Sequence, residues 1–344
     1  MSNAITYADA LKNVMLEAMK NPKTVLFGQN INDHKGMFGT TLGLADKFGK
    51  DRVIDTPICE EAITGVAIGT AINGLYPIVI HIRNDFALVS MNQLVNLASK
   101  YKYMFGGRFE VPMLIRMVIG RSWGQGAQHS QSLQATFSHF PGFTVIVPSS
   151  VASILVDYPY VMEHVKQPVI ALEHRLMYGL EFKTSDVSSL KPLKAHILRE
   201  GEDVTIIATS IMVLEALRAA EFTTNKVSCE VIDLNCTSPI DEETIIKSVS
   251  KTGRLIIADT SWREFGVCAE ICRLVLSSGI ILNDTVSTLG MAYTPCPTAK
   301  VLEDMYYPNV RDIVSEISRI SRVFIPLPSA VSATSYYKHF KGPF

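Results

Sequence analysis

The sequence predicts an α/β protein built from two consecutive doubly wound domains. Strand-sized apolar runs alternate with helical patterns, this alternation restarts after a polar segment rich in Ser, Lys and Pro, and 344 residues suffice for two domains. We expect a first domain over residues 1–185, a linker over 186–196, a second domain over 197–324 and a C-terminal arm over 325–344.

The first domain is expected to begin with an amphipathic helix over residues 6–20. Its apolar side chains follow the 3.6-residue period, and Thr6 with Asp9 forms a weak capping box. Further helices are expected over 42–48, from residue 60 onward and over 88–103, and strands over 25–28, 78–82, 113–119, 144–147 and 169–172.

The second domain repeats the alternation of strands and helices, which predicts βαβ units and a mainly parallel sheet. Strands are expected over 204–209, 228–234, 254–259 and 285–288, and helices over 213–221, 242–249 and 266–277.

Composition excludes several classes of function. With 47% hydrophobic and 19% charged residues, a net charge of −1 and no basic cluster, the chain is expected to bind neither nucleic acid nor an anionic membrane. The apolar runs are strand-sized and the start lacks the pattern of a signal peptide, so we expect a cytoplasmic protein. The six cysteines lack the spacing of a zinc site, and Cys268 with Cys272 fits an apolar helix face.

The stretch 54–69 joins two acids, Glu60 and Glu61, to a helix rich in small residues. Gly65, Gly69 and Asn73 recur every fourth position on one face, which lets another backbone come close. The acids have two interpretations: they complement the dipole at the helix start, or they belong to a functional site.

A second candidate site is the loop over residues 120–131, which combines glycines, a Trp, amides and His129 directly after a strand. In an open parallel sheet, ligands bind outside the carboxyl ends of the strands, where this loop is expected. The alternative is a surface loop whose histidine has no role.

These features together resemble a known family. The runs Phe38-Gly-Thr-Thr, Asp55-Thr-Pro-Ile-Cys-Glu, Ala127-Gln-His-Ser-Gln and Leu176-Met-Tyr-Gly, with Cys229-Glu-Val-Ile-Asp-Leu and Glu264-Phe-Gly-Val later, look like the β subunit of the thiamine-diphosphate-dependent 2-oxoacid dehydrogenases of pyruvate and branched-chain type. The resemblance implies a transketolase-like pyrimidine-binding domain followed by a transketolase C-terminal domain.

The resemblance also implies roles for individual residues. Glu60 would hydrogen-bond the aminopyrimidine of thiamine diphosphate and promote loss of the cofactor's C2 proton, while Glu61 would serve the helix N-terminus. His129 would orient the substrate or stabilise charge during the reaction. The implied cofactor-binding residues are Glu60, Ile58, Ile82 and Phe86.

The chain lacks the GDG motif and following Asn that hold magnesium and the diphosphate in this class. The resemblance therefore implies a separate α subunit that supplies the magnesium site, an α2β2 heterotetramer, and a lipoyl acyltransferase as a further partner. No metal site is expected in this chain, and the Asp that holds a structural potassium ion in some members is missing before Pro168.

The substrate is expected to be a small 2-oxo acid, and Arg83 and Gln131 are candidate contacts to it. Arg83 would grip a carboxylate or phosphate, or pair with Asp85. Because Arg83 departs from the family pattern, a carbon–carbon ligase of the transketolase-like or acyloin-forming type is an alternative. A non-catalytic doubly wound binding module is the alternative from another class.

Overall fold

The computed structural model describes residues 4–329 except 121–123, 185–186 and 188–189. Contacts divide the chain into two compact units. The first comprises Met1–Ile119 with Thr136–Pro192, and the second comprises Gly120–Ala135 with Leu193–Phe344. Most of the expected C-terminal arm lies outside the described residues.

The first unit is built on a parallel sheet with the strand order β6-β7-β5-β4-β2-β3. These strands are β2 (Thr24–Gly28), β3 (Val53–Asp55), β4 (Tyr76–His81), β5 (Met113–Ile119), β6 (Thr144–Ile146) and β7 (Pro168–His174). Every residue of β5 and β7 is buried, as expected for strands covered on both faces. A separate antiparallel pair joins β1 (Ala4–Thr6) to β8 (Glu181–Lys183).

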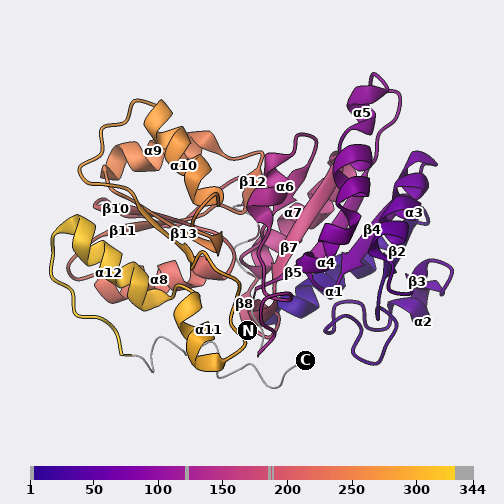
Figure 1. Ribbon diagram of the computed structural model, residues 1–344, viewed down its shortest axis with the longest axis horizontal. Coiled ribbons are helices and arrows are strands. Elements are labelled where there is room, and N and C mark those ends of the chain that lie inside the picture. Colours follow the sequence, from indigo (N-terminus) through magenta and orange to yellow (C-terminus); the bar gives the residue numbers. More distant parts are fainter. Residues whose placement is uncertain (1–3, 121–123, 185–186, 188–189, 330–344) are drawn as a thin grey trace. The chain divides into compact units, whose positions relative to one another are not determined.

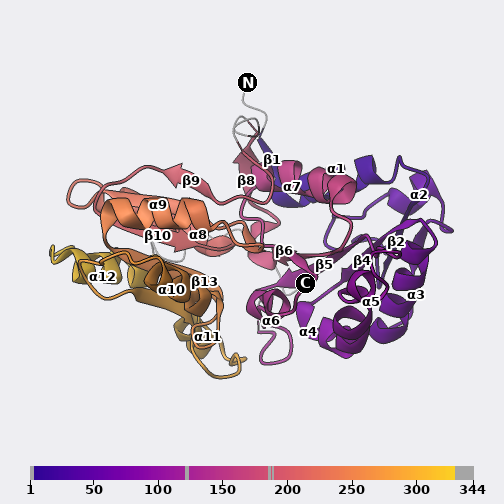
Figure 2. The same ribbon diagram turned by 90° about the horizontal axis from the view of Figure 1, so that it is seen from above.

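Helices cover both faces of this sheet (Figure 2). On one face, α1 (Tyr7–Ala18) packs beside α7 (Val151–His164), and α3 (Glu60–Ile72) lies on the other face against β4. The expected start of α1 is confirmed, since the Thr6 hydroxyl accepts a hydrogen bond from the Asp9 amide at 3.0 Å. A short helix, α2 (Leu44–Phe48), ends at Gly49, whose φ of 88° favours glycine. The first unit is therefore doubly wound, as predicted.

The prediction of one continuous helix over 88–103 is wrong. The structure has α4 (Asn84–Ala87), a 3-10 turn η1 (Leu88–Ser90), a π-helix η2 (Asn92–Ala98) and α5 (Tyr101–Met104). In the π-helical segment the Ser99 amide donates to the Leu94 carbonyl, five residues back. The wider turn buries Leu94, Val95 and Ala98 while Gln93 reaches the neighbouring helix α3, so packing against α3 sets the local winding.

The second unit has the strand order β14-β13-β10-β11-β9, and all pairs are parallel except that of β9 with β11. The strands of this sheet are β9 (His196–Arg199), β10 (Val204–Ala208), β11 (Cys229–Asp233), β13 (Leu255–Trp262) and β14 (Ser287–Met291), and β12 (Cys236–Ser238) is a further strand of the unit outside this sheet. Figure 1 shows α8 (Ile211–Thr223) and α12 (Val310–Ser321) on one face of the sheet and α9 (Glu242–Thr252) and α10 (Val267–Ser277) on the other. Each pair of helices contributes to its own apolar cluster, so this unit is also doubly wound.

Four elements of this unit were not predicted: β9, β12, α11 (Lys300–Tyr306) and α12. The signal for α12 was present in the sequence, because its buried residues follow the helical period. They are Val310, Ile313, Val314, Ile317 and Ile320.

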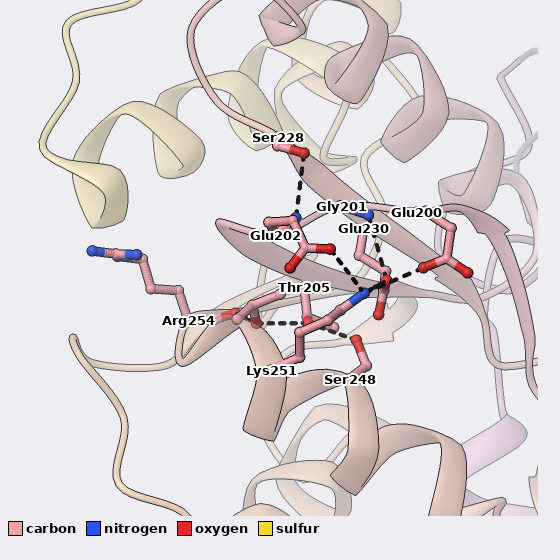
Figure 3. A network of polar contacts seen from close by, with 10 residues as sticks. Glu200, Gly201, Glu202, Thr205, Ser228, Glu230, Ser248, Lys251 and Arg254 are labelled. Atoms are coloured by element: carbon pink, nitrogen blue, oxygen red, sulfur yellow. Dashed lines mark hydrogen bonds and ion pairs between the residues drawn. The ribbon is translucent and has the colours of Figure 1, made fainter.

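A polar network lies at the amino ends of β10 and β11 (Figure 3). Lys251 of α9 forms ion pairs with Glu230 of β11 and, at 3.2 Å and 3.8 Å, with Glu200 and Glu202. The Glu230 side chain is fully buried, and the pKa of its carboxyl is lowered by hydrogen bonds from Lys251 and Ser248 despite that burial. The network therefore compensates a buried charge at the end of the sheet opposite to the ligand-binding edge.

Candidate active site

Glu60 is the first residue of α3, which begins five residues after the carboxyl end of β3. Its side chain is buried, and the Gln29 side-chain amide, just beyond β2, donates to Glu60 Oε1 at 3.1 Å. The Thr64 hydroxyl donates to the Glu60 carbonyl at 2.8 Å and continues the first turn. This places a buried carboxylate at the carboxyl edge of the parallel sheet, where α/β proteins bind ligands.

Glu61 has different surroundings from Glu60. It is exposed, and the Gln93 side-chain amide of η2 donates to Glu61 Oε1 at 2.9 Å. Both acids lie in the first turn of α3, where a negative charge complements the helix dipole. The burial of Glu60 alone makes it the better candidate for a role toward a bound ligand.

His81, the last residue of β4, is a neighbour of Glu60 for which no role was predicted. Burial lowers the pKa of its imidazole to about 4, and the negative charge of Glu60 offsets part of that effect. Its Nε2 atom is buried and has no hydrogen-bond partner among the described residues. A histidine that ends an apolar strand run was the available signal, because a polar group there faces the ligand edge.

The other candidates in the first unit differ in exposure. Ile82 and Phe86 are half-buried, and Arg83 is only 2% exposed. Ile58, the other implied cofactor-binding residue, is 84% exposed and therefore does not enclose Glu60 in this chain by itself. Asp85 is buried and accepts a hydrogen bond from the Asn84 side-chain amide at 3.0 Å.

His129 and Gln131 are both half-buried and belong to the second unit, because the contacts of Gly120–Ala135 are with that unit. Gly124 and Gly126 in this loop have φ values of 67° and 66°, which explains the need for glycine. The structure thus brings Glu60, His81 and Phe86 into one unit and His129 and Gln131 into the other. The Trp of this loop lies outside the described residues.

Metal-binding side chains do not gather within the described part of the chain, where no group of three His, Cys, Asp or Glu residues could hold a metal ion. Cys268 and Cys272 lie on α10 in contact with the apolar core, and burial raises the pKa of both thiols. Within the same described residues, no helix is long and apolar enough to cross a membrane.

Comparison with known proteins identifies the family. The domain families described as Transketolase, pyrimidine binding domain, and Transketolase, C-terminal domain, match residues 3–180 and 193–313. Pyruvate dehydrogenase E1 component subunit beta-2, mitochondrial, of Oryza sativa subsp. japonica is 38% identical across 94% of this chain and 88% of its own length. The corresponding subunit beta of Rickettsia conorii is 36% identical across 92% of this chain and 98% of its own. The chain belongs to the β subunits of the thiamine-diphosphate-dependent 2-oxoacid dehydrogenases.

For this β subunit, the predicted order of two transketolase-like domains is confirmed. A solved chain described as "Split gene transketolase, inactive beta4 tetramer" has the same fold, with a TM-score of 0.76 over 93% of this chain and 99% of that chain, at 22% identity.

The residues around Glu60 fit the pyrimidine half of the family's cofactor. A buried carboxylate can accept a hydrogen bond from a ring nitrogen or share a proton with it, and Gln29 holds one of its oxygens in place. The buried Nε2 of His81, which has no hydrogen-bond partner within the described part of the chain, is a second polar atom close to that carboxylate. The described residues of this chain offer a set suited to a heteroaromatic ring rather than to a metal ion.

Proposed function

We propose that the chain is the β subunit of a two-component enzyme that decarboxylates a 2-oxo acid and passes the acyl group to a lipoyl carrier. The observation that carries the proposal is Glu60, a buried carboxylate at the first turn of α3, in a chain of the β-subunit family. Thiamine diphosphate, when bound, would supply the carbanion chemistry that removes the carboxyl group.

In this proposal Glu60 binds the aminopyrimidine ring and holds or returns a proton at a ring nitrogen, with Gln29 fixing the orientation of the carboxylate. Phe86 and Ile82 provide apolar contacts to the ring, and Ile58 does so once its exposed side chain is covered. His129 orients the 2-oxo acid and stabilises charge during acyl transfer. Gln131 and Arg83 are proposed contacts to the substrate.

The partner is proposed to be an α subunit that holds magnesium and the diphosphate, in an α2β2 heterotetramer. Helix α3 supports a close partner: Val66 is 57% exposed, and a Cβ added at Gly69 would meet nothing within 4 Å in the described part of this chain. A backbone can approach closely at such a face.

Gly69→Ala tests this partner surface. The substitution is expected to stabilise the isolated chain by about 0.5–1 kcal/mol, because it raises helix propensity, while weakening association with the α subunit. Urea unfolding and sedimentation measure the two effects. Unchanged association would contradict docking at this face.

The substrate is proposed to be pyruvate or a similarly small 2-oxo acid, since the relatives are named pyruvate dehydrogenase components. An assay of the complex with two alternative acyl acceptors separates the candidate activities. Transfer of the acyl group to a lipoyl domain indicates the dehydrogenase, and transfer to an aldehyde indicates a carbon–carbon ligase.

The domain boundaries 1–185, 186–196, 197–324 and 325–344 are likewise proposals. The cytoplasmic location is also a proposal, whereas the relatives from rice and pea are named as mitochondrial proteins.

The central test compares Glu60→Gln with Glu61→Gln in the complex with the α subunit. Glu60→Gln is expected to lower turnover at least about 100-fold, because an amide cannot exchange a proton with the cofactor. Glu61→Gln, the control at the next position, is expected to stay within about 3-fold of the wild type because its side chain is exposed. Full turnover in Glu60→Gln would exclude the assignment, and calorimetry with thiamine diphosphate and magnesium separates lost binding from lost chemistry.

A further inference from the structure

The carboxyl edge of the second sheet contains a buried carboxylate, Asp259 of β13, that is bound by neutral donors. Asp259 is 0% exposed. The hydroxyls of Thr209 and Ser261 donate to it, and so does the Thr260 amide at 2.8 Å. A buried carboxylate must be hydrogen-bonded to be tolerated, and this one sits where parallel sheets present ligand sites.

The remaining donor to Asp259 comes from the segment that carries His129. Gln134 Nε2 donates to Asp259 Oδ1 at 2.7 Å and to Thr260 Oγ1 at 3.1 Å. Ser132 Oγ donates to Gln134 Oε1 at 2.9 Å and lies 3.1 Å from Thr260 Oγ1. The Gln134 and Ser132 side chains are buried, so these bonds are shielded from water.

Two further contacts hold the same segment. The Tyr307 hydroxyl donates to the Ser130 carbonyl at 3.3 Å, directly after His129. A Cβ at Gly126, three residues before His129, would lie 2.5 Å from Thr298 Oγ1, so the loop backbone also packs closely against Thr298 of the same unit. The edge of the second sheet is thus filled by the loop of its own chain.

We propose that Ser132, Gln134, Asp259 and Thr260 form a lock that fixes the position of His129, and that Gln134 and Asp259 are positioning residues of the reaction. This rests on the role proposed for His129. Because His129 is only three residues from Ser132 and five from Gln134, a lock at those two side chains restrains the backbone that carries the imidazole. Charge-assisted hydrogen bonds to a buried carboxylate are suited to this task, since they are short and strong.

The lock explains why the Asp259 carboxylate, at the carboxyl edge of the sheet, accepts hydrogen bonds from groups of its own chain and not from a ligand. In the alternative of a doubly wound binding module, this edge would be the place for a ligand. Here Asp259 directs its oxygens to Gln134 and to three neighbouring groups of the same unit. The second domain therefore contributes to catalysis by holding the loop.

Gln134→Met tests the lock, because the side chain keeps its length and loses its hydrogen bonds. The matched control is Thr205→Val, which removes buried hydroxyl bonds to Ser248 and Thr252 at the opposite end of the same sheet. Hydrogen exchange measured by mass spectrometry on the full chain follows residues 124–135. Steady-state kinetics of the complex with the α subunit follow the consequence for catalysis.

In Gln134→Met, exchange of residues 124–135 is expected to be at least about 10-fold faster than in Thr205→Val, since each buried hydrogen bond to a charged group contributes this order of magnitude. The same variant should lower kcat about 10-fold and leave the affinity for thiamine diphosphate within about 2-fold, because the proposed cofactor residues lie in the first unit.

Equal rates of hydrogen exchange of residues 124–135 in Gln134→Met and Thr205→Val would overturn the lock, whatever the enzymatic activity of the two variants. Faster exchange with an unchanged kcat would overturn the positioning role. If the wild-type complex proves inactive, the proposed function fails, and the exchange comparison still decides the lock.

Discussion

His81 should make the folded chain sensitive to acid, and this can be measured without the cofactor. The pKa of its imidazole is lowered from 6.5 to about 4, chiefly by burial. Between these values the unfolded chain binds a proton that the folded chain does not bind. Stability therefore falls as the pH falls from 6.5 to 4, and the contribution of His81 is fully present only above 6.5.

The size of the effect follows from the shift. A pKa change from 6.5 to about 4 lowers the free energy of unfolding by about 3 kcal/mol once the pH is below both values. About 2 kcal/mol of this is already lost at pH 5. His81→Phe keeps a ring of similar size and removes both the titration and the buried Nε2 that lacks a partner among the described residues. We therefore expect the variant to match or exceed the wild type in stability at pH 7.5.

Urea unfolding at several pH values between 7.5 and 4.5 measures this difference. His164→Asn, which removes an exposed histidine of α7, is the control and should follow the wild-type profile. Glu60→Gln should steepen the loss in acid, because the charge of Glu60 raises the pKa of His81. Parallel profiles for the wild type and His81→Phe would refute the reasoning.

Two further predictions concern ion pairs that contain a fully buried carboxylate. Arg116 is fully buried and donates two hydrogen bonds to Glu173, at 2.6 and 2.8 Å. Glu173→Gln should lower the free energy of unfolding by about 3–5 kcal/mol, because it leaves this buried guanidinium without a counter-charge. Urea unfolding measures the loss, and a value below about 1 kcal/mol would contradict the prediction. Lys251→Met should lower the free energy of unfolding by about 1 kcal/mol at pH 7 and by less below pH 4.5. The pKa of Glu230 is held below its usual value, and the ion pair is lost once that carboxyl is protonated in acid. Urea unfolding at both pH values measures the difference, and a loss that does not depend on pH would exclude this explanation.

The sequence was a good guide where local chemistry decides the structure. Thr6 begins α1 and Glu60 begins α3 as predicted, because a cap or a proline turn followed by acids defines a helix start within a few residues. The alternation of strands and helices correctly predicted the doubly wound sheets of both units, including the mainly parallel sheet of the second. Ordered motifs predicted the family, which the comparisons confirm.

The sequence was a poor guide where packing overrides local preference. The π-helix at Asn92–Ala98 depends on contacts with α3, which no helical period reveals. The exposure of Ile58, an implied cofactor-binding residue, is likewise decided by the packing around it and not by its motif. The burial of His81 beside Glu60 follows from the neighbouring strands β2 and β5 and cannot be inferred from its own strand, β4.

By itself, then, the sequence determined the two-domain α/β architecture and the family, and it singled out Glu60 and His129 as candidate site residues, because these depend on motifs and on periodic patterns along the chain. Only the tertiary structure decided that the His129 loop belongs to the second unit. Gln134 and Asp259 are 125 residues apart in the chain but belong to the same unit, and a hydrogen bond over that separation exists only after the second unit has folded.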